Sequence, residues 1–217
     1  MAIKGGVAGL VGTIGSGKST LAKFLDSKEG KIILGRHLPG DIPIEIIEEP
    51  TDRYGRRAFY TDPKRNTDRF ELSQGYLRML RHAVALSSPG VVILDMTLLA
   101  GFGTYGINSH RVERNLTHRG WKIYKGIIND ACDDFGRDNL SLPCWLESTL
   151  FYLEVDDVRL LQRRQTERGN PDDAGIIPLD YLERLNNRNR EFAKNPQKVY
   201  ERMFSLVAPK VVTLDAT

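Results

Sequence analysis

The sequence contains few cysteines, no long apolar run and little excess of charge of either sign. Its 217 residues include only two cysteines, Cys132 and Cys144, whose separation matches neither a metal-ligand spacing nor a disulfide framework. No apolar stretch approaches the roughly 20 residues that a transmembrane helix needs. The apolar run near the N-terminus is short and leads directly into a glycine-rich loop, unlike a signal peptide. These absences predict a cytoplasmic protein with no membrane partner.

The charge balance excludes little by itself. The chain carries 31 Lys and Arg residues against 28 Asp and Glu residues, which gives a formal net charge of +3. A nucleic-acid-binding protein is recognised by basic residues clustered on one face, so this small excess neither indicates nor excludes a nucleic acid partner.

The length fits one domain, since domains commonly contain about 100–200 residues. With no repeat and no linker, residues 1–217 are predicted to form a single domain.

Short apolar segments recur along the chain and predict the strands of a sheet. Most are apolar throughout rather than alternating, which is typical of parallel strands buried on both faces. The segment Lys31–Leu34 is compatible with a further strand or with a loop. The five predicted strands are Gly6–Val11, Ile42–Ile47, Val91–Asp95, Leu150–Val155 and Val211–Leu214.

Helical patterns separate these strands. Alternating strands and helices imply a parallel sheet with right-handed crossovers. The predicted fold class is therefore α/β, a three-layer sandwich in which helices flank a central parallel sheet. The predicted helices are Gly17–Ser27, Thr67–Leu86, Asp157–Arg168, a helix with Pro178 in its first turn, and two helices between Arg111 and Phe135 that are broken near Gly120.

A glycine-rich loop after the first strand carries the strongest functional signal. The eight residues from Gly12 to Ser19 fit the pattern G-x-x-x-x-G-K-[ST], with a predicted strand before them and an amphipathic helix after them. In such a P-loop, backbone N–H groups bind phosphate oxygens, Lys18 neutralises the β and γ phosphates, and the Ser19 hydroxyl faces Mg²⁺. The sequence therefore predicts ATP and Mg²⁺ as cofactors. The residues expected to contact the nucleotide are Gly12, Gly15, Ser16, Gly17, Lys18, Ser19 and Thr20.

The P-loop occurs in several classes of protein, and two of them do not fit. A switch GTPase needs the guanine-reading pattern N-K-x-D, which the sequence lacks. The chain is also short for a helicase or a transporter motor. A small kinase and a regulatory nucleotide-binding protein remain.

Acidic residues at the ends of two predicted strands favour a kinase. Glu48 and Glu49 follow the strand that ends at Ile47, and Asp95 ends the strand that begins at Val91. In open α/β sheets, ligands bind at the carboxyl ends of the strands. There Glu49 is placed to accept the proton of an attacking hydroxyl, and Asp95 to hold Mg²⁺ or its waters. An acidic strand end that faces solvent is the structural alternative.

Two helices carry further candidates. Phe70 and Gln74 are four residues apart and share a helix face, where an amide can bind the edge of a base. Arg164 and Arg168 share a face of the helix that precedes the Gly169–Ile177 segment, so they are placed to close over a triphosphate. A solvated face is the alternative for both arginines. The glycine-rich segment 101–106 is compatible with a border of the acceptor site and with a plain loop.

These motifs, in this order, resemble the deoxynucleoside kinase family from the P-loop to about Phe192. The Glu49–Tyr54 segment resembles the family's Glu-Pro segment. The residues from Arg163 to Arg168, followed by Ile177–Glu183, resemble the family's lid. The resemblance implies an enzyme that transfers the γ-phosphoryl group of ATP to the 5′-hydroxyl of a deoxynucleoside. It also implies a helical lid at about residues 163–178 and a homodimer formed through helices in the 111–135 region.

The resemblance assigns roles to individual residues. Glu49 would be the general base, and Gln74 would read the base of the nucleoside while Phe70 and Tyr54 pack around it. If the helix is matched to the family in a different register, Ser73 takes the place of Gln74. The remaining roles are those of Arg164 and Arg168 as lid arginines and of Asp172 or Asp173 near the sugar 3′-hydroxyl.

One departure from the family pattern leaves other functions open. The family usually has an acid, an arginine and a serine at the end of the central strand, whereas this chain has Asp95, Met96 and Thr97. Arg53, Arg56 and Arg57 are candidates to replace the missing arginine. The open alternatives are a (deoxy)nucleoside monophosphate kinase, a kinase acting on a modified base within DNA, and a catalytically inactive nucleotide-binding protein.

Overall fold

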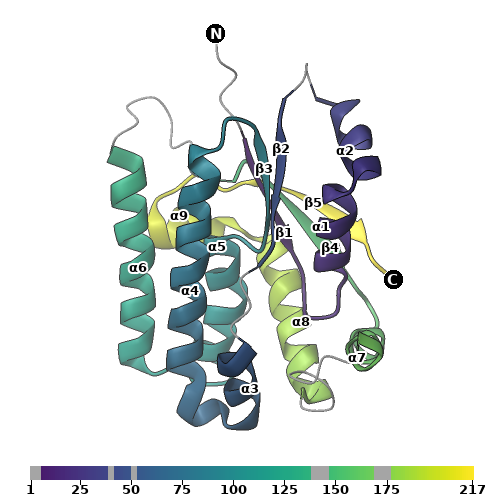
Figure 1. Cartoon of the computed structure of the whole chain (residues 1–217). Helices are drawn as coiled ribbons and strands as arrows, with labels where there is room; N and C mark the ends of the chain where they lie inside the picture. Colours follow the sequence, from purple (N-terminus) through teal and green to yellow (C-terminus); the bar gives the residue numbers. More distant parts are fainter. Residues whose placement is uncertain (1–5, 39–41, 50–52, 138–146, 169–176) are drawn as a thin grey trace.

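A computed structural model of the chain has a five-stranded parallel sheet at its centre (Figure 1). The structure describes residues 6–38, 42–49, 53–137, 147–168 and 177–217. The strand order is β2-β3-β1-β4-β5, and all four neighbouring pairs are parallel. The strands are β1 (Val7–Val11), β2 (Ile44–Ile47), β3 (Val91–Asp95), β4 (Thr149–Glu154) and β5 (Lys210–Asp215).

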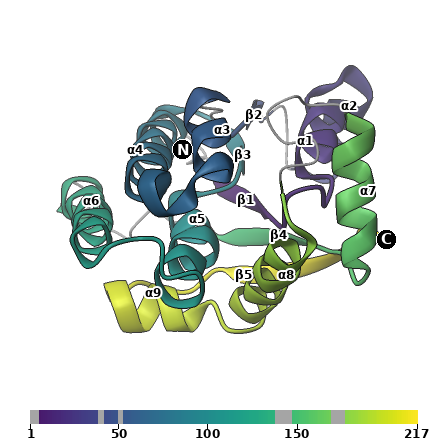
Figure 2. The ribbon, with the colours of Figure 1, turned by 90° about the horizontal axis from the view of Figure 1, so that it is seen from below.

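Helices cover both faces of the sheet. Helices α4, α5, α6 and α9 lie on one side of it, and α1 and α2 lie on the other (Figures 1 and 2). The helices are α1 (Lys18–Asp26), α2 (Lys28–Gly35), α3 (Arg53–Thr61), α4 (Pro63–Ser87), α5 (Leu98–Gly101), α6 (His118–Arg137), α7 (Val158–Arg168), α8 (Leu179–Lys194) and α9 (Gln197–Phe204), with two π-helical segments, η1 (Phe102–Gly106) and η2 (Asn108–Val112).

Apolar clusters fill the space on the two sides of the sheet. The larger cluster joins Leu150 and Tyr152 of β4 to Phe102, Tyr124 and Tyr200. On the α1 side, a smaller cluster is built around Leu10, Ala22 and Ile93. The predicted three-layer α/β sandwich is therefore confirmed. None of the helices in the described part of the chain combines the length and the hydropathy that crossing a bilayer requires.

All five predicted strands are present, with ends that differ by at most two residues. Two other local predictions are wrong. Lys31–Leu34 lies within helix α2, which begins where the Ser27 hydroxyl accepts a hydrogen bond from the Gly30 N–H, at 3.1 Å, and caps the helix. Gly120 does not break a helix, because α6 begins at His118 and the break lies before it.

The sheet gathers the chemically important segments at one edge. Leu10 pairs with Asp95, and Ile47 pairs with Leu94, so β1, β2 and β3 end side by side. Parallel strands place their carboxyl ends at the same edge of a sheet, which is where ligands bind in this class of fold. The P-loop, Glu49 and Asp95 therefore meet at this edge.

Candidate active site

The P-loop has the backbone conformation that its glycines permit. Gly15 and Gly17 have φ angles of 84° and 98°, in the left-handed region that side chains disfavour. A Cβ atom at Gly15 would also lie 2.8 Å from the carbonyl oxygen of Leu161. These two glycines let the chain turn directly from β1 into the N-terminus of α1, which begins at Lys18. The first turn of that helix offers its free N–H groups to an anion.

Lys18 is buried at the base of this loop. Its Nζ donates to the carbonyl oxygens of Gly12, at 2.9 Å, and Thr13, at 3.3 Å. Burial lowers the pKa of Lys18, and the charges of Asp95 and Glu49 oppose that shift. The ammonium group is thus held by two bonds at the place where a phosphate would lie.

A polar bridge from the helices behind the loop holds it in place. The Thr13 hydroxyl donates to Asn186 Oδ1 at 2.8 Å, and Asn186 Nδ2 donates to the carbonyl oxygen of Val155 at 2.9 Å. Gln165 Nε2 donates to the carbonyl oxygen of Ile14 at 3.4 Å. The P-loop is therefore tied to α7, to α8 and to the end of β4. Sequence reasoning missed Asn186, because nothing local marks an asparagine on an amphipathic helix as a loop support.

Ser19 and Asp95 form an oxygen-rich corner beside the loop. The Ser19 hydroxyl donates to Asp95 Oδ2 at 3.0 Å. Asp95 is 3 % exposed, and its Oδ1 has no hydrogen-bond partner within the described residues. Burial raises the pKa of Asp95, which the Lys18 charge opposes. A hydroxyl and an unsatisfied carboxylate oxygen are ligands that suit Mg²⁺ or its waters. The described residues contain no cluster of three or more His, Cys, Asp or Glu side chains that would bind a metal without phosphate oxygens.

Glu49 lies just after β2 and forms an ion pair with an arginine from α4. Nε and Nη2 of Arg78 both donate to Glu49 Oε1, and the Nε distance is 3.1 Å. Burial acts to raise the pKa of Glu49, but the charges of Arg78 and Lys18 outweigh it and hold that pKa below its ordinary value. Glu49 is therefore ionised at neutral pH.

A cavity of about 480 Å³ joins the P-loop to an aromatic compartment. Its volume falls in the range of about 300–1,000 Å³ that is usual for small-molecule sites. At one end lie Lys18 and Ser19, and Glu49 and Arg78 also line the wall. The residues of the aromatic end are Phe59, Tyr60, Phe70, Glu71, Gln74, Tyr105 and Tyr181.

The aromatic end is built from four separate elements. Phe59 of α3 stacks on Phe70 of α4, with ring centroids 4.9 Å apart. Tyr181 of α8 packs edge-on against Phe59 and Tyr60. Tyr105 comes from η1, and π-helical turns are frequent at functional sites. A flat aromatic ligand fits between such rings.

A second hollow lies on the other side of the P-loop. It shares Gly15, Gly17, Thr20 and Arg168 with the first cavity. Its outer wall includes Arg164 and the chain end from Leu214 to Thr217, and Arg164 Nη1 donates to the carbonyl oxygen of Ala216 at 2.7 Å. The loop thus separates two hollows that meet over its glycines.

Comparison with known proteins identifies the family. The profile of a family described as deoxynucleoside kinase matches residues 10–217. The chain belongs to the deoxynucleoside kinase family. The resemblance inferred from the sequence is therefore confirmed, and with it the prediction of an ATP-dependent phosphotransferase.

A solved structure supports the fold assignment. A deoxyadenosine kinase from M. mycoides, determined with bound dATP, aligns with this chain at a TM-score of 0.64 and 22 % sequence identity. The alignment covers 97 % of this chain and 90 % of that one. At this identity the likeness establishes the kinase fold. A comparison with curated proteins gave no match.

The structure brings most of the predicted site residues of this kinase into one place. Glu49, Phe70 and Gln74 line the first cavity together with Lys18 and Ser19 of the P-loop. Arg168 borders both hollows, whereas Arg164 borders only the second. The predicted nucleotide-contacting residues that border at least one hollow are Gly15, Ser16, Gly17, Lys18, Ser19 and Thr20, and the Gly12 carbonyl holds Lys18.

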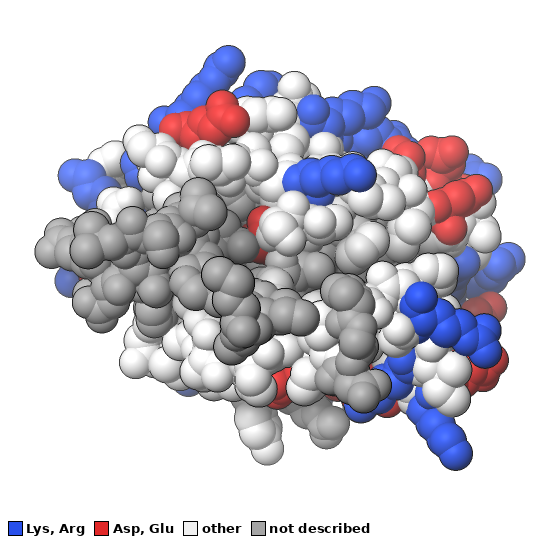
Figure 3. Space-filling model, turned by 90° about the horizontal axis from the view of Figure 1, so that it is seen from above, with Lys and Arg blue, Asp and Glu red and all other residues white. Residues whose placement is uncertain are grey.

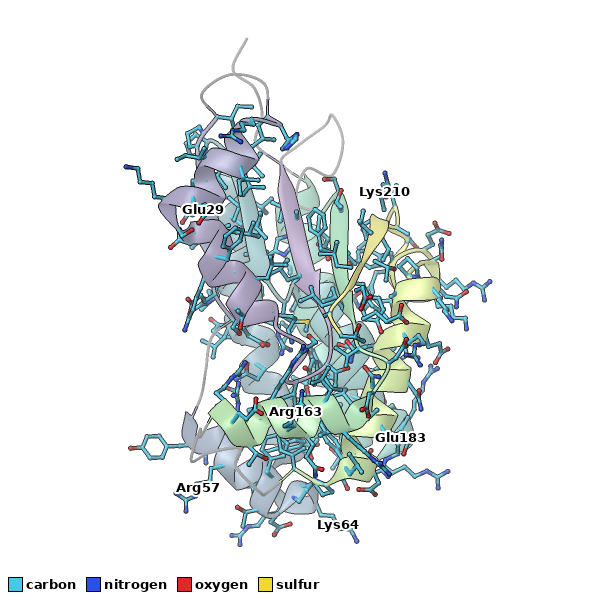
Figure 4. The ribbon with its side chains drawn as sticks, turned by 90° about the vertical axis from the view of Figure 1, so that its right-hand side faces the viewer. Glu29, Arg57, Lys64, Arg163, Glu183 and Lys210 are labelled. Atoms are coloured by element: carbon cyan, nitrogen blue, oxygen red, sulfur yellow. The ribbon has the colours of Figure 1, made fainter. Side chains whose placement is uncertain are left out.

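Other predicted residues lie elsewhere. Tyr54 is 90 % exposed and does not line the cavity, because the inner face of α3 is formed by Phe59 and Tyr60. Arg57 points away from the body of the protein (Figure 4), whereas Arg56 lines the cavity. Asp172 and Asp173 lie outside the described residues, and so does most of the predicted lid loop.

Sequence reasoning missed four residues that line the cavity: Phe59 and Tyr60 of α3, and Glu71 and Arg78 of α4. Glu71 is three residues before Gln74 on α4, and Arg78 is four residues after it, so helical spacing would have placed both on the Gln74 face. The burial of both charged residues supports that placement. Tyr105 belongs to the glycine-rich segment 101–106, which the sequence left open as a border of the acceptor site or a plain loop. The segment is helical, and Tyr105 lines the cavity.

Met96, which occupies the position where the family usually has an arginine, packs into the core. Its φ angle is 70°, and its side chain is 3 % exposed within the apolar cluster that includes Val11 and Leu98. The side chain therefore packs into the core and does not line the cavity. An arginine with the same backbone and side-chain direction would bury its charge among apolar groups, which is costly.

Proposed function

We propose that this kinase transfers the γ-phosphoryl group of ATP to the 5′-hydroxyl of a deoxynucleoside through the residues described above. The observation that carries the proposal is the single cavity that has a P-loop at one end and an aromatic compartment at the other. Glu49 lines that cavity, near enough to Lys18 for their charges to interact. A nucleoside with its base among the aromatic rings would direct its 5′ end toward the phosphates.

The P-loop end would bind the donor. The N-terminus of α1 and Lys18 stabilise negative charge on the β and γ phosphates. The nucleoside part of ATP would extend into the second hollow, against Arg164 and the chain end near Ala216. The solved relative was determined with bound dATP, a ligand of the same chemical class. Arg168, which borders both hollows, is placed to stabilise charge on the transferred group.

The aromatic end would bind the acceptor. Phe59 and Phe70 offer rings on which a base stacks, and Gln74 offers an amide donor and acceptor to its edge. Glu49, ionised at neutral pH, would accept the proton of the 5′-hydroxyl as that oxygen attacks. Because phosphoryl transfer has a loose transition state, a weakly basic carboxylate suffices. We retain Asp172 as a candidate contact to the sugar.

Ser19 and Asp95 would hold Mg²⁺ together with phosphate oxygens and water. Their hydrogen bond and the unsatisfied Oδ1 of Asp95 fit the hard oxygen donors that this ion prefers. When bound, the ion neutralises charge on the triphosphate. The ATP requirement also fits the cytoplasm, which we propose as the compartment of this protein.

We also propose a homodimer formed along α4 and α6. Tyr76, Leu80 and Val84 lie four residues apart on the solvent face of α4, and each is about half exposed. Ile123 of the neighbouring α6 is 44 % exposed. Apolar side chains aligned along packed helices form a surface that a second copy would cover.

On the face seen from above, acidic and basic side chains of the described residues are interspersed and form no continuous basic groove (Figure 3).

The proposed reaction is tested with purified protein, Mg²⁺ and ATP against a panel of deoxynucleosides and deoxynucleoside monophosphates. ADP release is followed, with Lys18→Met as the inactive control. Turnover with a deoxynucleoside is the expected result and also gives the base preference. Turnover with monophosphates alone would transfer the acceptor site to the arginines of α3. Binding of ATP without turnover of any acceptor would contradict a kinase.

A further inference from the structure

Arg78 occupies a position that packing alone does not explain. Arg78 is 5 % exposed, yet it lines the cavity beside Gln74. It follows Gln74 by one turn of α4. Its guanidinium lies 5.7 Å from the centre of the Tyr105 ring. Nη1 is 3.4 Å from the Tyr124 hydroxyl. A buried guanidinium loses much of its hydration, and apolar residues of similar size often give equal or greater stability. Its presence at a cavity wall therefore points to a role in that cavity.

The contact between Arg78 and Glu49 has an uneven geometry. Nε and Nη2 both donate to Oε1, so Oε2 receives neither bond. In the usual two-pronged pair of arginine and carboxylate, each oxygen takes one bond. Here one oxygen anchors the carboxylate. The side chain of Glu49 keeps 19 % of its surface accessible, and the residue lines the cavity.

We propose that Arg78 is the positioning residue of the acceptor site, anchoring Glu49 through Oε1 so that Oε2 receives the acceptor hydroxyl. This inference rests on the proposed function. In the reaction, the O–H bond of the acceptor breaks and its proton passes to Oε2. The freed oxygen forms a bond to the γ-phosphorus, and the bond from that phosphorus to the ADP oxygen breaks. Arg78 keeps all its protons, and no further reactant is needed.

Arg78 thereby supplies from α4 the guanidinium that the central strand lacks. Met96, at the family's arginine position, packs into the core. Arg78 reaches Glu49 directly through Nε and Nη2, and Arg56 lines the same cavity.

The charge of Arg78 also sets the protonation of Glu49. Burial acts to raise the pKa of Glu49, and Arg78 opposes it most strongly, followed by Lys18. Removing the guanidinium therefore leaves the carboxylate to be protonated at a higher pH. The other charged and titratable groups that interact with Glu49 are Lys18, Arg56, Glu71, Asp95, Tyr105 and Tyr124.

Gly101 gives an independent way to move Arg78 without changing its charge. A Cβ atom at Gly101 would lie 2.6 Å from Arg78 Nη1 and 2.9 Å from Nε. The backbone of Gly101 is right-handed helical, with φ −60° and ψ −44°, so alanine fits it without strain. Because the flexible end of an arginine can yield, we expect Gly101→Ala to displace the guanidinium and to leave the fold intact.

The experiment compares Arg78→Met, Arg78→Lys and Gly101→Ala with the wild-type kinase. The control is Arg69→Met, which removes the same charge from an exposed position on the same helix. For each protein, kcat is measured from pH 5 to pH 9 with the best deoxynucleoside of the panel, and ATP binding is measured by calorimetry. Circular dichroism confirms folding. If Arg78→Met does not fold, Arg78→Lys and Gly101→Ala carry the test.

We expect Arg78→Met to lower kcat by about 10²-fold, the smaller end of what a misplaced general base costs. The acidic limb of its pH profile should shift to higher pH, because the charge of Arg78 acts to lower the pKa of Glu49, and its ATP affinity should stay unchanged. Arg78→Lys and Gly101→Ala should show smaller changes in the same direction. The control should match the wild type.

Loss of activity without a shift of the acidic limb would assign Arg78 a structural role only. Unchanged kcat in Arg78→Met would overturn the inference directly. These outcomes differ from a failure of the proposed function, in which the wild-type protein itself turns over no deoxynucleoside.

Discussion

At the scale of single residues, opposite charges pack closely around the cavity. Lys18 and Arg78 face Glu49 and Asp95, and their mutual attraction offsets part of the cost of burying them. Removing one member leaves its partner buried and uncompensated. Single substitutions here therefore change both chemistry and stability, and the two effects have to be measured separately.

Glu49→Gln tests the general base. The amide cannot accept the proton, so we expect kcat to fall by about 10²–10⁴-fold while ATP still binds. Steady-state kinetics and calorimetry give the two quantities. Glu45→Gln, which changes an exposed carboxylate on β2, the strand that precedes Glu49, serves as the control. Turnover that survives Glu49→Gln in a folded protein would show that another group takes the proton.

Glu71 makes stability depend on pH. Burial raises its pKa above the ordinary value of 4.5, while the Ser109 hydroxyl, which donates to Oε1 at 2.6 Å, opposes the shift. The folded protein thus favours the protonated carboxyl. Its contribution to stability is largest below pH 4.5 and is lost as the pH rises through the raised pKa.

Glu71→Gln removes this dependence, because the amide stays neutral and its oxygen still accepts from Ser109. We expect the Tm of this variant, relative to wild type, to increase between pH 5 and pH 8. The difference in Tm should be about 2–4 °C for each kcal/mol by which the ionisation of Glu71 lowers the free energy of unfolding. Calorimetric scans at both pH values measure it. A Tm difference that is constant or shrinks with rising pH would show that Glu71 is ionised in the folded state without penalty.

At the scale of elements, the P-loop depends on the helices behind it. Asn186 of α8 bonds both to Thr13 and to the carbonyl of Val155. Asn186→Ala removes both bonds, and each buried partner left unsatisfied costs about 1–3 kcal/mol. We expect a lower Tm and weaker ATP binding, measured by calorimetry. Asn187→Ala, on the exposed side of the same helix, should change neither. An unaltered ATP affinity in Asn186→Ala would show that the loop holds its shape alone.

The local sequence predicted elements whose pattern is complete within a few residues. The five strands and the P-loop belong to this class, because apolar runs and glycine spacing determine them directly. Helix α2 was missed because the Ser27 cap outweighed a short apolar run. The π-helical turns were not predicted, since they depend on packing against other elements.

The sequence predicted those residues of the candidate site that a single strand end or a single helix face marks. Glu49, Gln74 and Asp95 follow from strand ends and helix faces. The pairing of Arg78 with Glu49 joins residues 29 positions apart on different elements, so only the fold reveals it. Tyr54 was placed in the site by resemblance, but the inner face of α3 is formed by Phe59 and Tyr60.

At the scale of the whole molecule, the exposed apolar face of α4 is the remaining structural question. Leu80→Asp places a charge in the centre of the proposed dimer surface, and we expect it to convert a dimer to a monomer. Sedimentation velocity measures the change. Lys64→Asp, at the exposed beginning of the same helix, is the control. A wild-type protein that sediments as a monomer at high micromolar concentration would contradict the proposed dimer.

The central claim is that the two ends of one cavity bring a deoxynucleoside 5′-hydroxyl to the γ-phosphate of ATP. The most direct measurement identifies the product, by ³¹P NMR, from Mg²⁺-ATP and the best deoxynucleoside, alongside its 5′-deoxy analogue. The account predicts a 5′-monophosphate from the nucleoside and no phosphorylated product from the analogue. Phosphorylation of the analogue, or a product carrying phosphate at another position, would contradict it.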